Sequence, residues 1–461
     1  MTKERFDLIV LGGGSAARDG GQRAARDYGA NVVLVESTRW GGSCPNVACK
    51  PTKAYLVAAD LVHDVNELAE ELGIETGPAR ANLARVKARK DSLTKPQERW
   101  VEDLNSAGLA TVDGQATFVD AHTVRVGARE LESERILIAT GSRTFVPPIE
   151  GLDDVDWIDH VSALDLTELP ESLLVVGGGP VGLEFAQIFA RFGSRVTVVQ
   201  SAERLSPRSD AQAVAELAAA FEDEGIEVLV SSSITRVAPD GTAVVAGPDG
   251  AEQTVAAERV LLASGRVPNV ESLGLDQLGV ETTRSGIVVD DRLRTSVPGI
   301  WAAGDVTGLA QFTPVAQYQA RIAVDDMFAA DAPRADYSNL PTAIFTDPEL
   351  AGIGVTEEEA RRDGLEFDAV VHPIKYVQRA SYTNTKHGLY KLIFERGSRR
   401  VIGVHVVCRG ASDVVQGLTL ALRAGATIDD FAHVHHAFPT WGEGVKAAAE
   451  QALPKPTRAA R

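Results

Sequence analysis

Two segments of the chain repeat one pattern of apolar and polar residues. In the first, Phe6–Leu11 is apolar except for Asp7, and a glycine turn, a helical stretch and the apolar run Val32–Val35 follow. In the second, the apolar run LLVV precedes another glycine turn, a helical stretch and a strand pattern that ends at Gln200. Continuous apolar runs are typical of parallel strands buried on both faces. We therefore expect two strand–turn–helix–strand units.

The first glycine turn has the spacing of a dinucleotide-binding fingerprint. Gly12, Gly14 and Ala17 form the pattern G-x-G-x-x-A, and Glu36 ends the next strand. The first glycine allows a tight turn, the second lets a pyrophosphate approach the backbone, and the small third residue lets helix and strand pack closely. The helix N-terminus favours the phosphates and the acid accepts from a ribose hydroxyl. We expect a dinucleotide here.

The second turn repeats the fingerprint with a different strand end. Gly177, Gly179 and Gly182 have the G-x-G-x-x-G spacing, and Gln200 stands where the first copy has its acid. Related segments follow each copy, RILIATGSR at 135–143 and RVLLASGRVPN at 259–269. An internal repeat of this kind predicts two nucleotide-binding domains and two dinucleotides.

Composition narrows the class of protein. The chain has 461 residues, 44% of them hydrophobic and 24% charged, and a formal net charge of −18. This acidity argues against binding nucleic acid phosphates, and no apolar run reaches the roughly 18 residues of a membrane span. The N-terminus enters a strand pattern and lacks the apolar core of a signal peptide, so we expect a cytoplasmic protein with neither nucleic acid nor membrane as partner.

Two of the three cysteines, Cys44 and Cys49, lie in WGGSCPNVACKPTK at 40–53. A disulfide staple, a metal site and a redox pair are the alternatives, and three cysteines in so long a chain are no disulfide framework. Metal is the weaker option because no second Cys/His pair at zinc-finger spacing accompanies them. Pro45 suits the first turn of a helix, and a helix N-terminus stabilises a thiolate. A slightly distorted helix would bring the two sulfurs together, which favours a working dithiol.

At this point the chain resembles the flavoprotein disulfide reductases from end to end. The resemblance rests on the two fingerprints, GGSCPNVACKPTK, IATGSR, LEFA after the second fingerprint and GIWAAGD; FTDPELAGIGVTEEEA and FPTWGEG resemble the interface domain of that family. It implies FAD on the first fingerprint, NADPH or NADH on the second, and a homodimer whose active sites are shared across the interface. Beyond the fingerprints, the cofactor-binding residues that it implies are Gly42, Lys53, Thr140, Gly141, Gly265, Asp305 and Thr313.

The resemblance also implies the fold. We expect an α/β protein with two Rossmann-like dinucleotide-binding domains and a C-terminal α+β dimerisation domain. The expected domains are FAD-binding at 1–147 and 273–336, NAD(P)-binding at 148–272, dimerisation at 337–452, and a flexible tail at 453–461.

Catalytic roles follow from the same resemblance. Cys49 would lie against the flavin as the charge-transfer thiol, and Cys44 would be the interchange thiol that meets the substrate. Lys53 would reach the flavin and pair with Glu184, and such a pair stabilises the anionic reduced flavin. Cys408 is expected to be a packed small hydrophobe.

One motif departs from the family. The disulfide-reducing members have His-Pro-Thr-x-x-Glu, and the matching run here is FPTWGE, with Phe438 in place of the histidine and Glu443 retained. Phenylalanine carries no proton, and acid–base help contributes about 10²–10⁴ in rate. His436 is the candidate replacement. We therefore expect a small electrophilic acceptor: a quinone, a metal ion, or a disulfide with a low-pKa thiol.

Two alternatives stay open at this stage. One is a conventional disulfide reductase of the dihydrolipoamide dehydrogenase type, with His436 as proton relay. The other resembles 2-ketopropyl-coenzyme M carboxylase, which also has phenylalanine at the lost histidine. The nucleotide is open too: NADH sites want an acid where Gln200 stands, whereas Arg204 and Arg208 just beyond it favour the 2′-phosphate of NADPH.

Overall fold

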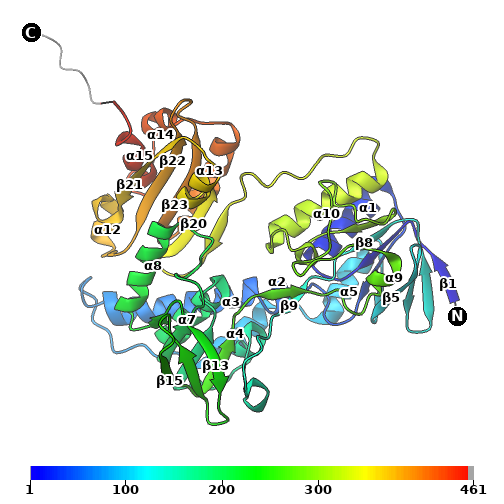
Figure 1. Ribbon diagram of the computed structural model, residues 1–461, viewed down its shortest axis with the longest axis horizontal. Helices are drawn as coiled ribbons and strands as arrows, with labels where there is room; N and C mark the ends of the chain where they lie inside the picture. Colours follow the sequence, from blue (N-terminus) through cyan, green and yellow to red (C-terminus); the bar gives the residue numbers. More distant parts are fainter. Residues whose placement is uncertain (1, 455–461) are drawn as a thin grey trace, which may run out of the picture. The chain divides into compact units, whose positions relative to one another are not determined.

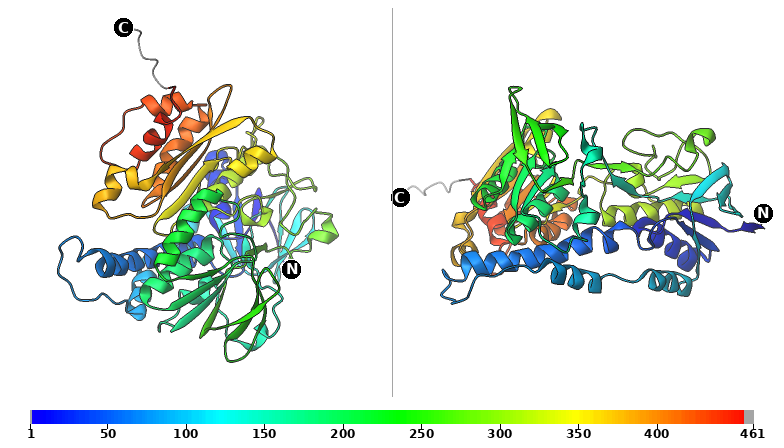
Figure 2. Two further views of the ribbon diagram at one scale, coloured as in Figure 1. Left: turned by 60° about the vertical axis from the view of Figure 1, so that its left-hand side comes forward. Right: turned by 90° about the horizontal axis from the view of Figure 1, so that it is seen from below.

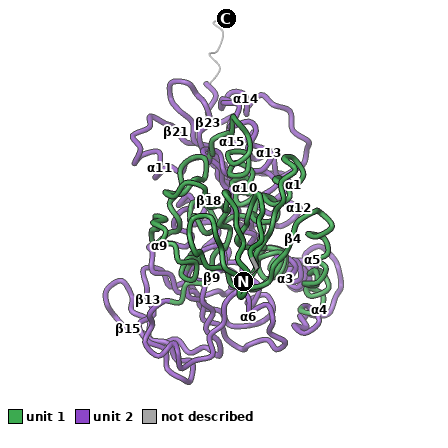
Figure 3. Tube along the Cα trace, turned by 90° about the vertical axis from the view of Figure 1, so that its right-hand side faces the viewer, with its two compact units in different colours: residues 1–52, 87–146, 265–336 green, residues 53–86, 147–264, 337–461 purple. Residues whose placement is uncertain are grey.

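The computed structural model describes residues 2–454, so most of the tail expected at 453–461 lies outside the described residues. The chain forms two compact units (Figure 3). Unit 1 contains residues 1–52, 87–146 and 265–336, and unit 2 contains residues 53–86, 147–264 and 337–461. The three-domain division expected from the sequence stays a prediction.

Unit 1 is built on a parallel sheet of five strands. The strand order is β18-β8-β2-β3-β4, and all neighbouring strands run parallel. Every residue of β2 is buried, as its apolar run predicts. The strands are β2 (Leu8–Leu11), β3 (Val32–Glu36), β4 (Leu109–Asp113), β8 (Ile136–Ile138) and β18 (Ile300–Ala302).

Helices α1 (Ser15–Tyr28) and α10 (Thr313–Phe328) pack against each other and against this sheet (Figure 1). A Cβ at Gly20 of α1 would lie 3.1 Å from Leu137 of the sheet and 3.3 Å from Ala320 of α10, so small residues permit this approach. The rest of unit 1 is a sheet in the order β1-β7-β6-β5 and a β9–β17 pair. Those strands are β1 (Thr2–Arg5), β5 (Ala116–Asp120), β6 (Thr123–Val126), β7 (Arg129–Glu132), β9 (Ser142–Thr144) and β17 (Arg266–Pro268).

Unit 2 contains a second parallel sheet, in the order β12-β11-β10-β16. Helices α7 (Pro180–Phe192) and α8 (Ala211–Asp223) accompany it, and the antiparallel sheet β13-β14-β15 is drawn in green (Figure 2). The strands are β10 (Ser172–Val176), β11 (Arg195–Val199), β12 (Glu227–Leu229), β13 (Ser233–Val237), β14 (Thr242–Ala246), β15 (Glu252–Ala256) and β16 (Arg259–Leu262).

The C-terminal part of unit 2 is an antiparallel sheet in the order β19-β20-β23-β22-β21, with helices packed on it. This confirms the predicted mixed α/β class with two parallel sheets and an α+β C-terminal region. No helix among residues 2–454 is long and apolar enough to span a bilayer. The elements are β19 (Thr342–Ile344), β20 (Glu349–Gly354), α11 (Glu357–Arg362), β21 (Phe367–Pro373), α12 (Gln378–Tyr382), β22 (Leu389–Glu395), β23 (Val401–Cys408), α13 (Ala411–Arg423), α14 (Ile428–His433) and α15 (Glu443–Glu450).

Candidate active site

The first glycine turn leaves the start of helix α1 open to an anion. Gly12 has a φ of 126°, and a Cβ there would lie 2.3 Å from the carbonyl oxygen of Ala139, so glycine is required. Gly14 is the N-cap of α1, and no side chain caps the helix. The first N–H groups of a helix have no intrahelical acceptor, and the helix dipole favours negative charge. The turn therefore fits a dinucleotide pyrophosphate.

Glu36 is held at the end of β3, beside this turn. Its Oε2 accepts a hydrogen bond from the N–H of Gly13 at 2.6 Å, and its Oε1 accepts one from the N–H of Thr38 at 2.8 Å. Oε1 also accepts the hydroxyl of Thr38 and the N–H of Arg39, whereas Oε2 accepts the N–H of Gly13 and keeps a lone pair for a ribose hydroxyl. The acid expected for an FAD ribose has the chemistry and the position for that contact.

Three further segments that contain predicted cofactor-binding residues, or adjoin them, converge within unit 1. Asp305 Oδ2 accepts a hydrogen bond from the hydroxyl of Ser142 at 2.8 Å, and Arg266 Nε donates to that same hydroxyl at 2.7 Å. Thr140 and Gly141 lie directly before Ser142, between β8 and β9. Residues predicted from separate motifs thus lie together in space.

The two cysteines lie on two successive helices. Cys44 is half-buried in the short helix α2 (Ser43–Asn46), whereas Cys49 is exposed and begins α3 (Cys49–His63). The sequence predicts one distorted helix, and the structure corrects this: Val47 ends α2 with a non-helical φ of −141°. The Asn46 side chain donates to the carbonyls of Trp40 and Gly42 at 2.9 and 2.8 Å, which closes the short turn.

Cys49 is therefore the first residue of the 15-residue helix α3, whereas Cys44 lies on a different helix. Its Sγ lies 3.9 Å from the hydroxyl of Thr313, the first residue of α10 and another predicted cofactor-binding residue. The positive end of the helix dipole lowers the pKa of a thiol placed there. This geometry favours the thiolate form at Cys49.

Lys53 and Glu184 form a close ion pair in unit 2. The Nζ of Lys53 lies 2.8 and 2.7 Å from the two carboxylate oxygens of Glu184. Glu184 also accepts a hydrogen bond from the N–H of Phe345 at 3.1 Å, and the ammonium lies 4.3 Å from the centroid of that phenyl ring. The pair implied by the resemblance thus exists, and the contact with Phe345 is one that the sequence interpretation lacks.

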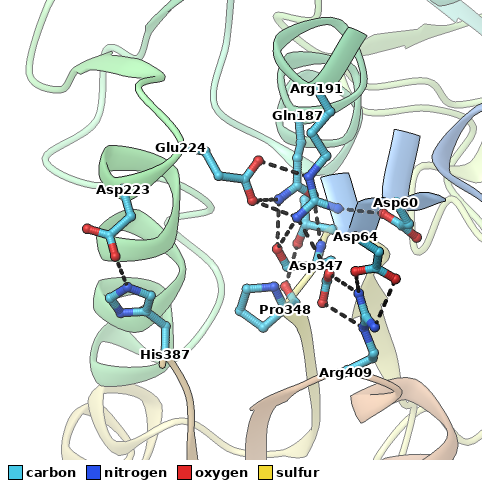
Figure 4. Close-up of polar contacts among 11 residues, drawn as sticks. Asp60, Asp64, Gln187, Arg191, Asp223, Glu224, Asp347, Pro348, His387 and Arg409 are labelled. Atoms are coloured by element: carbon cyan, nitrogen blue, oxygen red, sulfur yellow. Dashed lines mark hydrogen bonds and ion pairs between the residues drawn. The ribbon is translucent and has the colours of Figure 1, made fainter. Parts of the chain in front are cut away.

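A second set of contacts fixes helix α7, which carries Glu184. One turn further along, Gln187 Nε2 donates to the carbonyl of Asp347 at 2.7 Å and its Oε1 accepts the N–H of Asp347 at 2.7 Å. Arg191 donates to that carbonyl at 3.1 Å, to Glu224 at 2.6 Å and to Asp60 at 2.6 Å (Figure 4). These bonds tie α7 to the segment that supplies Phe345.

The second glycine turn repeats the geometry of the first. Gly177 has a φ of 109°, and a Cβ there would lie 2.5 Å from the carbonyl oxygen of Ala263. Gly179 is the N-cap of α7 without a side-chain cap, and a Cβ on Gly182 would lie 1.9 Å from the carbonyl of Gly177. This turn fits a second dinucleotide. Gly265, the predicted partner from the later segment, belongs to unit 1.

The two arginines considered for nucleotide selection lie beyond the end of β11 and differ in their contacts. Gln200 Oε1 accepts the N–H of Gly178 at 3.1 Å, so an amide does what the carboxylate of Glu36 does in the first copy. Arg204 donates to the carbonyl of Pro207 at 2.9 Å and is also paired with the carboxylate of Glu358. Arg208 is exposed.

The C-terminal motif has an exposed aromatic ring and a fixed carboxylate. Phe438 is 74% exposed. Glu443 begins α15 and accepts the N–H groups of Gln378 at 2.6 Å and Thr440 at 3.3 Å. The Nε2 of His436 is buried without a hydrogen-bond partner among residues 2–454. Burial, and then the positive charge of Lys446, lowers the pKa of His436, so this imidazole is neutral near pH 7.

Three side chains near the loop that precedes Cys44 are not predicted from the sequence as part of the site. Arg18 and Lys95 both lie over the ring of Trp100, at 4.5 and 4.2 Å from its centroid. The signal available in the sequence is Arg18 itself, a charged residue directly after the small residue that ends the first fingerprint. Lys95 and Trp100 carry no such signal because they come from a distant segment.

Comparison with known proteins decides the family. Residues 6–320 match the pyridine nucleotide-disulphide oxidoreductase family, and residues 340–449 match the dimerisation domain of that family. The chain is a pyridine nucleotide-disulfide oxidoreductase. The predicted family is thus confirmed, and this oxidoreductase is an FAD-dependent enzyme that uses a pyridine nucleotide. Among residues 2–454, no group of three His, Cys, Asp or Glu side chains is arranged to hold a metal ion.

The relatives of this oxidoreductase span its whole length. A mercuric reductase of Streptomyces lividans is 38% identical over 456 residues, which covers 96% of each chain. A dihydrolipoyl dehydrogenase of Geobacillus stearothermophilus is 34% identical over 460 residues, or 98% of this chain and 97% of that protein. Among solved structures, the HOCl-induced flavoprotein disulfide reductase RclA of Escherichia coli is 28% identical with a TM-score of 0.86, covering 97% of this chain and 100% of RclA.

Proposed function

We propose that this oxidoreductase passes two electrons from NAD(P)H through FAD to Cys44 and Cys49, and from this dithiol to a small electrophilic acceptor. A quinone, a metal ion and a disulfide with its own low-pKa thiol are acceptors of this kind. The observation that carries the proposal is Phe438, an exposed ring where the resemblance places the acid–base histidine, in a chain that retains both cysteines.

When bound, FAD accepts a hydride from the nicotinamide and supplies the electron pair that reduces the cysteine pair. Lys53 would place a positive charge at the reducing site, and Glu184 would hold that ammonium in position. The N-terminus of α3 would stabilise Cys49 as a thiolate. With a quinone, two electrons leave the reduced cysteine pair and the S–S bond forms. The two quinone oxygens each gain a proton, from any remaining S–H group and from water.

The missing acid limits which acceptors suit the site. Reduction of an ordinary disulfide releases a thiolate that needs a proton, and a positioned acid contributes about 10²–10⁴ in rate. His436 is a weak candidate for that task because its lowered pKa leaves it neutral and its Nε2 is buried. The mercuric reductase relative and a Cu(II) complex of RclA support a metal ion among the acceptors.

The proposal includes NADPH as the nucleotide and a homodimer as the working form. Gln200 brings no negative charge against a 2′-phosphate, and Arg208 is exposed and close in sequence, whereas Arg204 is already paired with Glu358. The match to the dimerisation domain supports the dimer, and a second copy would cover the exposed Phe438.

A consumption assay tests the proposal. NADPH and NADH are each supplied with a benzoquinone, mercuric ion or lipoamide, using wild type, His436→Ala and the matched control His433→Ala. We expect rapid turnover with the quinone or mercuric ion in all three proteins, and slow turnover with lipoamide. Fast lipoamide reduction that His436→Ala abolishes and His433→Ala does not would establish a conventional disulfide reductase instead.

A further inference from the structure

Two cations lie over the indole ring of Trp100 in unit 1, near the loop that carries Cys44. The guanidinium carbon of Arg18 is 4.5 Å from the ring centroid, and the Nζ of Lys95 is 4.2 Å from it. Such cation–π contacts are attractive. The Nε of Arg18 is buried and has no hydrogen-bond partner within the described part of the chain. The ring, and not a hydrogen bond to Nε, therefore positions this guanidinium.

The same ring packs against the loop that precedes Cys44. A Cβ on Gly41 would lie 2.6 Å from Cε2 of Trp100, and a Cβ on Gly42 would lie 2.5 Å from the Cα of the N-cap residue of α1. These close approaches hold the loop immediately before Cys44 against the start of α1, whose first turn carries Arg18. Burial lowers the pKa of Arg18, whereas the negative charges of Cys44 and then of Asp19 oppose that shift.

The other charges around this cluster are already paired. Asp19, beside Arg18 on α1, accepts two hydrogen bonds from Arg321 of α10, at 2.6 and 2.8 Å. Lys95 is paired with Asp103 of α5 (Gln97–Ser106). Cys49 begins the neighbouring helix α3 and has the helix N-terminus as its own source of positive potential. Arg18 is thus the cation on the first turn of α1, against whose start the loop before Cys44 packs.

We propose that Arg18, held against Trp100, is a positioning residue that keeps Cys44 in its thiolate form. The S–H bond of Cys44 breaks and its proton leaves to water, so no oxidant or acid–base partner is required. In the disulfide-reducing members of the family an imidazole manages this proton; here Phe438 stands in its place. The inference rests on the proposed function, because the charge state of Cys44 matters only if that thiol meets the acceptor.

The test measures the protonation of Cys44 directly. FAD-loaded protein is reduced by two electrons without oxygen, alkylated with iodoacetamide at a series of pH values, and the labelled peptides are quantified. An opposite charge within a few ångströms lowers a thiol pKa by about one unit or more. We expect Arg18→Met to move the alkylation midpoint upward by about one pH unit, which slows labelling of Cys44 about tenfold at pH 7. Arg18→Lys should restore most of the wild-type profile.

Arg99→Met is the matched control, since Arg99 is exposed and adjoins Trp100 in the sequence; its profile should equal that of wild type. Trp100→Leu frees the guanidinium and should shift the midpoint in the same direction, which keeps the test valid if Arg18→Met does not fold. An unchanged midpoint in the folded Arg18 or Trp100 variant would overturn the inference. A reduced wild-type protein without any alkylatable Cys44 would instead overturn the proposed function.

Discussion

Glu184 keeps a charge in a side chain that is only 8% exposed. Removing a carboxylate from water is costly unless charge and hydrogen bonds replace the solvent. Lys53 supplies the charge with two short contacts, and the N–H of Phe345 supplies a further hydrogen bond. The Lys53 side chain is 35% exposed, so it lies at the edge of the buried region that contains Glu184. The pair is thus ready to present a positive charge.

Removing the Lys53 ammonium should reveal how much free energy the burial of the Glu184 carboxylate costs. Lys53→Met leaves Glu184 with the Phe345 N–H alone, and we expect the free energy of unfolding to fall by about 2 kcal/mol, as for loss of a hydrogen bond to a charged group. Denaturant unfolding measures the change. Lys50→Met, three residues earlier and exposed, is the control and should unfold like wild type. Equal losses in both variants would contradict the importance of the pair.

Phe438 allows a gain-of-function prediction. Phe438→His places an imidazole five residues before Glu443, the spacing of the disulfide-reducing members. We expect lipoamide reduction to become about tenfold faster or more, because a positioned acid–base group adds about 10²–10⁴ in rate. Phe438→Leu controls for loss of the ring. If the histidine and leucine variants reduced lipoamide at one rate, the missing imidazole would not be what limits disulfide reduction.

At the scale of elements, helix α7 combines a nucleotide-binding turn with a dense ion network. Arg191 and Arg409 face four carboxylates, so negative charge is in excess. Arg409 lies 2.7 Å from Asp64 and 2.7 Å from Asp347 (Figure 4). Each guanidinium is shared, and the network depends on both. The carboxylates are Asp60, Asp64, Glu224 and Asp347.

Arg191 is the member whose loss should be most damaging. Its side chain is 3% exposed, and Arg191→Met would leave Asp60, Glu224 and Asp347 facing one another with less compensation. Breaking a buried pair in this way costs about 3–5 kcal/mol. Denaturant unfolding should show that loss, whereas Arg195→Met, an exposed position at the start of β11, should be close to neutral. A near-neutral Arg191→Met would mean that solvent already screens the network.

The same excess of negative charge predicts a pH dependence. Burial, reinforced by Asp347 and Asp64, raises the pKa of Asp60 from 3.8 to about 6, although Arg191 and Arg409 oppose the shift. The folded protein then binds this proton more tightly than the unfolded chain, so ionised Asp60 lowers stability above pH 6. That stability is regained as the pH falls from 6 toward 3.8.

A comparison with Asp60→Asn isolates this effect. The difference in unfolding free energy between wild type and Asp60→Asn should be constant above about pH 6 and should shift in favour of wild type at lower pH. Asp153→Asn removes an exposed carboxylate and serves as control. A difference that stayed flat from pH 7 to 4 would contradict the raised pKa of Asp60.

Some features of the helices, strands and turns can be predicted from the sequence, and others cannot. Glycines at 12 and 177 mark both nucleotide turns because their backbone conformations exclude other residues, and each buried strand beside them reads as an apolar run. The break at Val47 depends on the Asn46 side chain, which no periodicity encodes. The contacts of Arg18 with Trp100 and of Arg204 with Glu358 join segments far apart in the chain, so neither follows from local pattern.

At the scale of the whole molecule, each unit contains one parallel sheet with one glycine turn at a helix start. The internal repeat therefore corresponds to two glycine turns of the dinucleotide-binding type, and the family match over residues 6–320 spans both. The antiparallel C-terminal sheet lies within the match to the dimerisation domain. Under the proposed function, electron entry, thiol chemistry and subunit association belong to different parts of one chain, and Cys44 and Cys49 are the step through which all electrons pass.

A count of thiols before and after reduction tests that account most directly. The chain has three cysteines, and Cys408 is fully buried in unit 2. Protein as purified and protein reduced anaerobically with NADPH are each denatured and labelled with a maleimide. We predict that Cys408 alone is labelled in the first sample and that all three cysteines are labelled in the second. Equal labelling of Cys44 and Cys49 in both samples would show that they do not cycle, and would contradict the proposed electron route.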